Sequence, residues 1–156
     1  SQPYTVAVQT MLLKVGKRDK VLEVGTGSGY QAAVLAEMGV KVYTIERQRE
    51  LYRKAQIMLA DLGYRIHFFL GDGYEGQPQY GPYDGIIITA ATAEVPDKLL
   101  KQLRIGGRLV VPKGERDSQV MTLYERRGED DYEITTHGYF VFVPMLRGIA
   151  NGNDRN

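Results

Sequence analysis

The segment Val21–Tyr30 carries three glycines at alternate positions, between an apolar run and the start of a helical pattern. Gly25, Gly27 and Gly29 lack a Cβ atom, so the chain can turn tightly there and a ligand can approach the amides of the following helix. A dinucleotide-binding loop also needs a glycine at its sixth position, and this chain has Tyr30 there. The loop therefore predicts a nucleotide-like cofactor that has no pyrophosphate group.

Polar residues follow the next three apolar segments, and each is suited to ligand binding. Glu46 stands about twenty positions beyond the glycines, where a carboxylate can accept hydrogen bonds from two vicinal ribose hydroxyls. Asp72, which precedes Gly73, can accept a hydrogen bond from an adenine amino group, and Thr89 follows the fourth apolar run. Parallel strands bring their carboxyl ends to one edge of a sheet, so we expect these residues to share one cleft.

Together these positions favour S-adenosylmethionine (AdoMet), because Glu-x-Gly-x-Gly-x-Gly is the spacing seen in AdoMet-dependent methyltransferases. The candidate cofactor-binding residues are Glu23, Gly25, Thr26, Gly27, Ser28, Gly29, Glu46, Asp72, Gly73 and Thr89. Each feature also has a structural alternative: a tight turn at the glycines, a helix-start acid at Glu46 and an Asp-Gly turn at Asp72.

Thr89-Ala90-Ala91 stands where amino-group methyltransferases usually carry Asn-Pro-Pro-Tyr or Asp-Pro-Pro-Tyr. Oxygen atoms of that tetrapeptide hold the target nitrogen, so its absence argues against methylation of a base or an amide nitrogen. His67 and His137 both fall in predicted strands, and no cluster of His, Asp and Glu has metal-ligand spacing. We therefore expect structural histidines and no metal.

The hydrophobic pattern predicts the elements that hold these residues. Helices are expected at 4–15, 30–38, 51–62 and 96–103, with Ser1 as the first N-cap and Gly39 and Gly63 ending the second and third. Strands are expected at 20–24, 41–45, 66–70, 83–88, 105–111, 120–124 and 132–143, the last two joined by a turn at 125–131. This layout predicts an α/β, Rossmann-like sheet of seven strands, mostly parallel, with an antiparallel C-terminal hairpin and helices on both faces.

Length and composition restrict the class of protein further. A chain of 156 residues, 43% hydrophobic, predicts one domain at 1–148 and a polar, disordered tail at 149–156. The net charge of +1 gives no case for nucleic-acid binding, and no apolar run reaches the ~20 residues that span a bilayer. The absence of cysteine excludes disulfides, thiolate metal sites and a cysteine nucleophile. Without a targeting segment, the expected location is the cytoplasm.

Several segments occur together in an order that resembles the protein-L-isoaspartate O-methyltransferases. They are Ser1-Gln2-Pro3-Tyr4, 21–30 with Gln31-Ala32-Ala33, Gly71-Asp72-Gly73, 83–91, Gly106-Gly107 and Phe142-Val143-Pro144, and the likeness extends over about 1–148. The resemblance implies methyl transfer from AdoMet to the free carboxylate of L-isoaspartyl residues in damaged proteins and peptides, which leads to their repair.

The resemblance also assigns roles to both ends of the chain. Ser1 matches a family serine near the transfer site that orients the substrate carboxylate, with a helix N-cap as its structural alternative. Val143, Pro144 and Leu146 match residues that border the peptide-binding cleft. The family carries a further segment before the serine, so we expect this chain to lack part of the usual cover of the cofactor. Two alternatives stay open: an AdoMet-binding module without activity, and another small-molecule O-methyltransferase.

Overall fold

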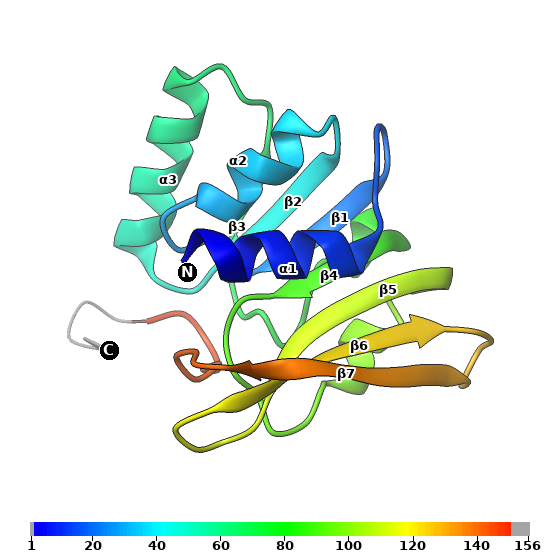
Figure 1. The fold of residues 1–156 in the computed structure, drawn as a ribbon. Coiled ribbons are helices and arrows are strands. Elements are labelled where there is room, and N and C mark those ends of the chain that lie inside the picture. Colours follow the sequence, from blue (N-terminus) through cyan, green and yellow to red (C-terminus); the bar gives the residue numbers. More distant parts are fainter. Residues whose placement is uncertain (1, 151–156) are drawn as a thin grey trace.

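Seven strands form one sheet within residues 2–150, the part of the chain that the computed structural model describes (Figure 1). They lie in the order β3-β2-β1-β4-β5-β6-β7; the first five pair in parallel, and β6 is antiparallel to both of its neighbours. Their bounds are β1 Lys20–Val24, β2 Lys41–Glu46, β3 His67–Leu70, β4 Tyr83–Ile88, β5 Leu103–Lys113, β6 Gln119–Arg126 and β7 Tyr132–Phe140. The predicted fold class is confirmed.

Helices connect the parallel strands, as the periodic pattern predicts. Their bounds are α1 Pro3–Leu13, α2 Tyr30–Glu37, α3 Arg49–Asp61, the 3-10 helix η1 Pro78–Tyr80 and α4 Asp97–Leu100. Gly39 and Gly63 follow α2 and α3 with φ of +81° and +86°, the left-handed conformation in which glycine commonly ends a helix. The N-cap of α1 is Gln2, so the prediction of Ser1 as the cap is wrong; Ser1 itself lies outside the described residues.

Strand residues alternate between two hydrophobic cores, one on each face of the sheet. On one face α1, α2 and α3 pack against residues that include Val21 and Ile87. On the other face α4 packs against their sequence neighbours Leu22 and Ile86. All four strand residues are fully buried, which explains why β1 and β4 read as continuous apolar runs. The strand ends are therefore the part of the sheet left available for a ligand.

The last strand is shorter than predicted, and this frees the segment that follows it. β7 ends at Phe140 rather than at residue 143, because Phe142 donates its backbone N–H to the side chain of Gln119 instead of to the backbone of β6. The chain then runs beside the end of β4, where Ala91 donates its N–H to the Val143 carbonyl at 2.7 Å. The C-terminal residues thus reach the carboxyl edge of the parallel strands.

Other boundaries differ from the predictions as well. The helix predicted at 96–103 is reduced to α4, because Leu103 already belongs to β5 and pairs with Tyr83. The tail predicted from 149 includes Ala150, whose N–H donates to the Arg47 carbonyl at 2.9 Å. Residues 151–156 of that tail lie outside the described part of the chain.

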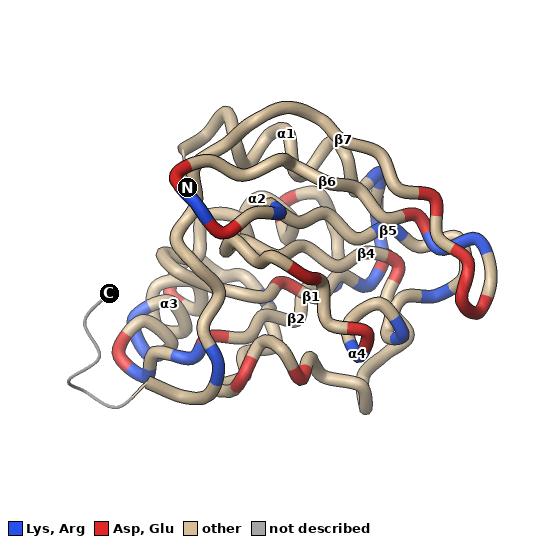
Figure 2. Tube along the Cα trace, turned by 90° about the horizontal axis from the view of Figure 1, so that it is seen from below, with Lys and Arg blue, Asp and Glu red and all other residues tan. Residues whose placement is uncertain are grey.

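Acidic and basic positions intermingle along the chain trace (Figure 2). On the turn between β6 and β7, Arg127 pairs with Glu133 and Asp130 pairs with Lys101. These pairs are largely exposed, so each contributes little to stability. Between residues 2 and 150, no helix combines the length and apolar character needed to cross a membrane.

Candidate functional site

The glycine loop between β1 and α2 adopts a backbone conformation that favours glycine. Gly25, Gly27 and Gly29 have φ of +100°, +53° and +88°. A Cβ atom on Gly25 would lie only 2.5 Å from the hydroxyl oxygen of Thr89, so space is also lacking. That hydroxyl lies 2.6 Å from the Gly25 carbonyl oxygen and 3.0 Å from the Val24 carbonyl oxygen. Thr89 therefore fastens the loop to the end of β4.

Glu46 holds the same loop from the end of β2. Its Oε1 accepts the backbone N–H of Gly27 at 3.0 Å, and its Oε2 accepts that of Gln48 at 2.8 Å. The residue is buried. Each carboxylate oxygen has a second lone pair, so both can still accept a hydrogen bond from a ligand hydroxyl. The geometry is compatible with the predicted ribose contact and adds a structural role for Glu46.

Glu23 places a fully buried carboxyl group beneath the loop. Its Oε1 accepts the hydroxyl of Thr44 at 2.6 Å, and the Thr44 oxygen lies 2.6 Å from that of Thr26. Its Oε2 has no hydrogen-bond partner among the described residues. Burial raises the pKa of Glu23 to about 8; the Thr44 hydrogen bond opposes this rise and the nearby Glu46 adds to it. A positive charge brought near Glu23 would favour its ionised form.

These residues line a cleft of about 350 Å³, a volume typical of small-molecule sites. The cofactor candidates that line it are Glu23, Gly25, Thr26, Gly27, Ser28, Glu46, Gly73 and Thr89. Two further candidates, Gly29 and Asp72, are not among the described residues that line it. A Cβ atom on Gly29 would lie 3.0 Å from the Leu59 side chain, so this glycine allows α3 to pack close to the loop.

Asp72 takes part in a turn after β3. Its Oδ1 accepts the backbone N–H of Tyr74 at 2.9 Å, and its carbonyl accepts that of Glu75 at 3.1 Å. These bonds form an Asx-type turn, the structural alternative that the Asp-Gly pair offers. The adjacent Gly73 lines the cleft, and a Cβ atom there would lie 2.3 Å from a methyl group of Val24. A contact between Asp72 and adenine stays a prediction.

The residues predicted to border a peptide line this first cleft as well. Val143, Pro144 and Leu146 all contribute to its wall. A second cleft, of about 540 Å³, shares Phe142, Pro144 and Met145 with the first. The two clefts therefore have a common wall, and molecules bound in each would meet there.

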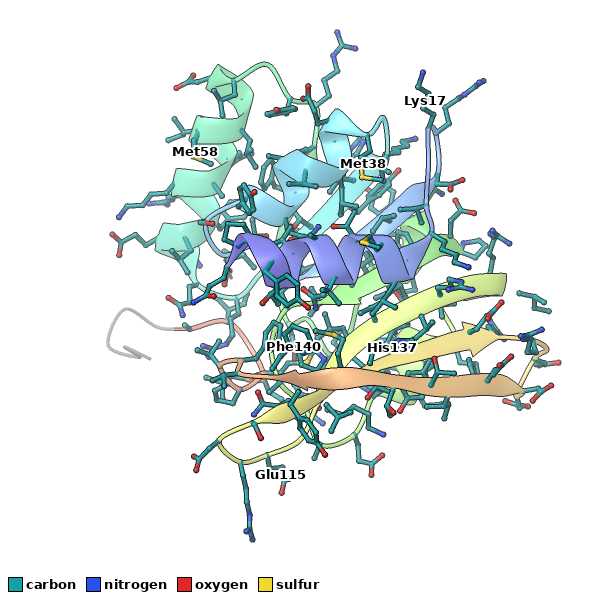
Figure 3. All side chains as sticks on the ribbon, viewed as in Figure 1. Lys17, Met38, Met58, Glu115, His137 and Phe140 are labelled. Carbon is teal, nitrogen blue, oxygen red and sulfur yellow. The ribbon has the colours of Figure 1, made fainter. Side chains whose placement is uncertain are left out.

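The second cleft has charged residues of both signs around it. Its lining includes Glu94, Glu115, Arg116 and Arg147. Figure 3 shows Glu115 at the outer end of the connection between β5 and β6. Polar residues around an apolar wall are suited to an extended peptide, which presents both backbone groups and side chains.

Several residues of the first cleft were not predicted from the sequence. Val6 of α1, Gln31 of α2, and Arg47 and Gln48 after β2 all line it. The Oε1 atom of Gln31 and the Nη1 atom of Arg47 are buried without a hydrogen-bond partner within residues 2–150. Gln31 lies in the first turn after the glycine loop and Arg47 directly follows Glu46. This proximity to predicted ligand residues is the signal that could have identified them.

The remaining predicted residues lie elsewhere. Ser1, the predicted catalytic residue, is outside the described residues. His67 stacks on Tyr43 with ring centroids 4.6 Å apart, and His137 lies on β7 beside Thr135 (Figure 3). Neither histidine lines a cleft described above. In residues 2–150 no group of three or more His, Asp or Glu side chains is arranged to hold a metal ion.

Similarity to solved structures extends over most of the chain. A solved protein-L-isoaspartate O-methyltransferase has a TM-score of 0.86 and 31% identity, covering 98% of this chain and 48% of its own. A SAM-dependent methyltransferase from Geobacter sulfurreducens, solved in complex with S-adenosyl-L-homocysteine, has a TM-score of 0.61 and 21% identity. The match covers 70% of this chain and 47% of that structure, and it shows a shared fold.

Sequence comparison identifies the family. A protein-L-isoaspartate O-methyltransferase of Christiangramia forsetii is 57% identical over 147 residues, which are 94% of this chain and 68% of that protein. The chain thus spans about two thirds of the length of this relative. A family profile described as protein-L-isoaspartate(D-aspartate) O-methyltransferase matches residues 1–150. The chain therefore belongs to the protein-L-isoaspartate(D-aspartate) O-methyltransferase family.

Proposed function

We propose that this chain transfers the methyl group of AdoMet to the free carboxylate of L-isoaspartyl residues in damaged proteins and peptides. The single observation that carries the proposal is the common wall of the two clefts, formed by Phe142, Pro144 and Met145. A cofactor on one side and a peptide on the other would meet at this wall. Family membership supports the identity of the reaction.

The residues of the first cleft fit AdoMet. When bound there, AdoMet would supply a methyl group carried on a positively charged sulfur. Glu46 would accept hydrogen bonds from the ribose hydroxyls, and the glycine loop would admit the ligand close to its backbone amides. Glu23 lines the cleft and has a carboxyl oxygen without a partner among the described residues, so a cationic ligand would compensate its burial.

Methyl transfer to a carboxylate requires little of the protein beyond the positioning of the two reactants. A substrate carboxylate has a pKa near 4 and is ionised at neutral pH, so no general base is required. A carbon–oxygen bond forms as the carbon–sulfur bond breaks, and the opposite charges of the two reactants are neutralised. The buried Met145 and the neighbouring apolar wall exclude water, which favours this step. Alignment of the two reactants provides the remaining rate acceleration.

The methyl ester is the intermediate from which the repair proceeds. Attack by the adjacent backbone nitrogen expels methanol and closes a succinimide, which hydrolyses partly to normal aspartate. This second stage needs no protein group, which agrees with a site built only to hold and align two reactants. A cytoplasmic location, and the absence of nucleic-acid and membrane partners, remain predictions.

A transfer assay tests the proposal. The chain is incubated with methyl-labelled AdoMet and an isoaspartyl peptide, in parallel with the normal aspartyl peptide of the same sequence. Base-labile label on the isoaspartyl peptide alone supports the repair enzyme. If no peptide is labelled while AdoMet still binds by calorimetry, the chain is an AdoMet-binding module. Labelling of small carboxylic acids in place of the peptide would indicate another O-methyltransferase.

A further inference from the structure

A C-terminal segment, Met145–Ala150, runs from the end of β4 to the end of β2, beside the first cleft, which is the proposed cofactor cleft; we name this segment the strap. At its first end Met145 donates its N–H to the Ala91 carbonyl at 2.7 Å, beside the end of β4. At its last end Ala150 donates its N–H to the Arg47 carbonyl at 2.9 Å, beside the end of β2. Met145 and Leu146 of the strap line the cleft, as does Arg47 at its last attachment, so the beginning of the strap forms part of the cleft wall.

The side chain of Arg47 holds the middle of the strap. Its Nε donates to the Gly148 carbonyl at 3.3 Å and its Nη2 donates to the Arg147 carbonyl at 3.4 Å. Its Nη1 is buried without a partner among the described residues. Both bonds are near the upper limit of hydrogen-bond length, and together they join one guanidinium group to two successive carbonyl groups of the strap.

Met145 is buried in the core and its carbonyl accepts the Tyr74 hydroxyl at 3.3 Å, but the residues of the strap that follow it have few buried contacts. Leu146, Arg147 and Ile149 are exposed. Gly148 has φ of +72°, and a Cβ atom built on it would meet no atom within 4 Å. Arg147 lies over the ring of Tyr74 at 4.3 Å from its centroid, which is a further contact of the middle of the strap. Segments with few buried contacts open at low free-energy cost.

The strap connects the two clefts. Met145 belongs to their common wall, and Arg147 lines the second cleft. Arg47 directly follows Glu46, whose carboxylate holds the glycine loop. A change at the Arg47 end of the strap would therefore affect the first cleft directly and the second cleft through the strap.

We propose that Arg47 is a positioning residue that keeps the strap closed over the cofactor cleft, and that the strap opens when the cofactor exchanges. This proposal rests on the proposed function and adds to it the route by which the cofactor enters and leaves. While closed, the strap completes the wall against which the peptide binds. Loss of the Arg47 side chain should speed cofactor release and weaken peptide binding, with a smaller effect on the chemical step.

A reversible cross-link tests the opening directly. The chain has no cysteine, so the pair Gln48→Cys and Ala150→Cys introduces the sole thiols. These two residues form a parallel bridge, and the spacing of about 4.8 Å between neighbouring strands suits a disulfide. We expect oxidation to slow both the binding and the release of S-adenosylhomocysteine by about tenfold or more, and reductant to restore the rates. Equal rates before and after reduction would overturn the proposal.

Substitution of Arg47 tests the attachment, with the exposed Arg49 as the matched control. Stopped-flow measurements should show S-adenosylhomocysteine leaving Arg47→Met about tenfold faster than wild type, the scale of lost hydrogen bonds to a charged group. Arg47→Lys should fall between the two, peptide KM should rise more than kcat falls, and Arg49→Met should match wild type. Equal release rates for Arg47→Met and Arg49→Met contradict the proposal. A wild-type chain that does not bind S-adenosylhomocysteine contradicts the proposed function instead.

Discussion

The backbone N–H of Gly27 donates to Oε1 of Glu46 at 3.0 Å, joining two sequence motifs that are nineteen residues apart. The second oxygen of the same carboxylate accepts the N–H of Gln48 at 2.8 Å. The glycine loop and the acidic residue that ends β2 therefore form one preassembled unit. The orientation of the carboxylate is set by the fold, which reduces the ordering that a ligand must impose.

Substitution of Glu46 should weaken cofactor binding measurably. Glu46→Gln retains one acceptor oxygen but replaces the other with an NH₂ group, which cannot accept a hydrogen bond from ribose. We expect the binding free energy of S-adenosylhomocysteine to weaken by about 1–2 kcal/mol by calorimetry. Glu50→Gln, on the exposed start of α3, is the control and should bind as wild type does. Unchanged affinity in Glu46→Gln would contradict the prediction that Glu46 binds the ribose hydroxyls.

A methyl group at Gly25 should damage the loop. Gly25→Ala combines an unfavourable φ of +100° with a Cβ only 2.5 Å from the Thr89 hydroxyl oxygen. We expect a loss of about 1–3 kcal/mol in the free energy of unfolding and at least about tenfold weaker cofactor binding. Gly16→Ala, where a Cβ meets no atom within 4 Å, should differ little from wild type in both. Wild-type binding by Gly25→Ala would show that the loop tolerates side chains.

Glu23 should make stability depend on pH. Its pKa is about 8 in the folded chain against an ordinary value of 4.5, so between these pH values the folded state holds a proton that the unfolded state has lost. Stability should therefore fall as the pH rises from 4.5 to 8. Glu23→Gln mimics the protonated form, so its free energy of unfolding in urea should not show this fall and should exceed that of wild type at pH 8. Parallel stability curves for the two proteins would contradict the raised pKa.

Ser1 should affect turnover more than cofactor affinity if it orients the substrate carboxylate. We expect Ser1→Ala to lower kcat in the transfer assay and to leave the AdoMet dissociation constant near the wild-type value, because a hydroxyl that contacts only the substrate does not hold the cofactor. Losses of equal size in both quantities would indicate a structural role for the serine.

The order of elements and the glycine loop could be predicted because their signals are local. Apolar runs mark β1 and β4, and the glycines at 25, 27 and 29 stand where the backbone takes positive φ. Glu46 was found because it ends an apolar run, and the end of a parallel strand lies at the ligand edge of the sheet.

The parts that were missed depend on contacts between distant residues. Arg47 donates a hydrogen bond to Gly148, which is 101 positions away in the sequence, and no local sequence pattern indicates this contact. The end of β7 depends on whether Phe142 pairs with β6 or with the Gln119 side chain. Asp72 carries the same sequence signal for a turn as for a ligand contact, and the structure shows the turn.

The selectivity of methyl transfer for isoaspartyl peptides is the property that distinguishes a repair methyltransferase from other methyltransferases. The initial rate of base-labile labelling is measured with an isoaspartyl peptide and with its aspartyl twin, at the same AdoMet concentration. If the two clefts hold AdoMet and an isoaspartyl peptide, the methyl group is transferred to the isoaspartyl peptide and none above background to the twin. Equal labelling of both peptides, or of neither while AdoMet remains bound, would contradict it.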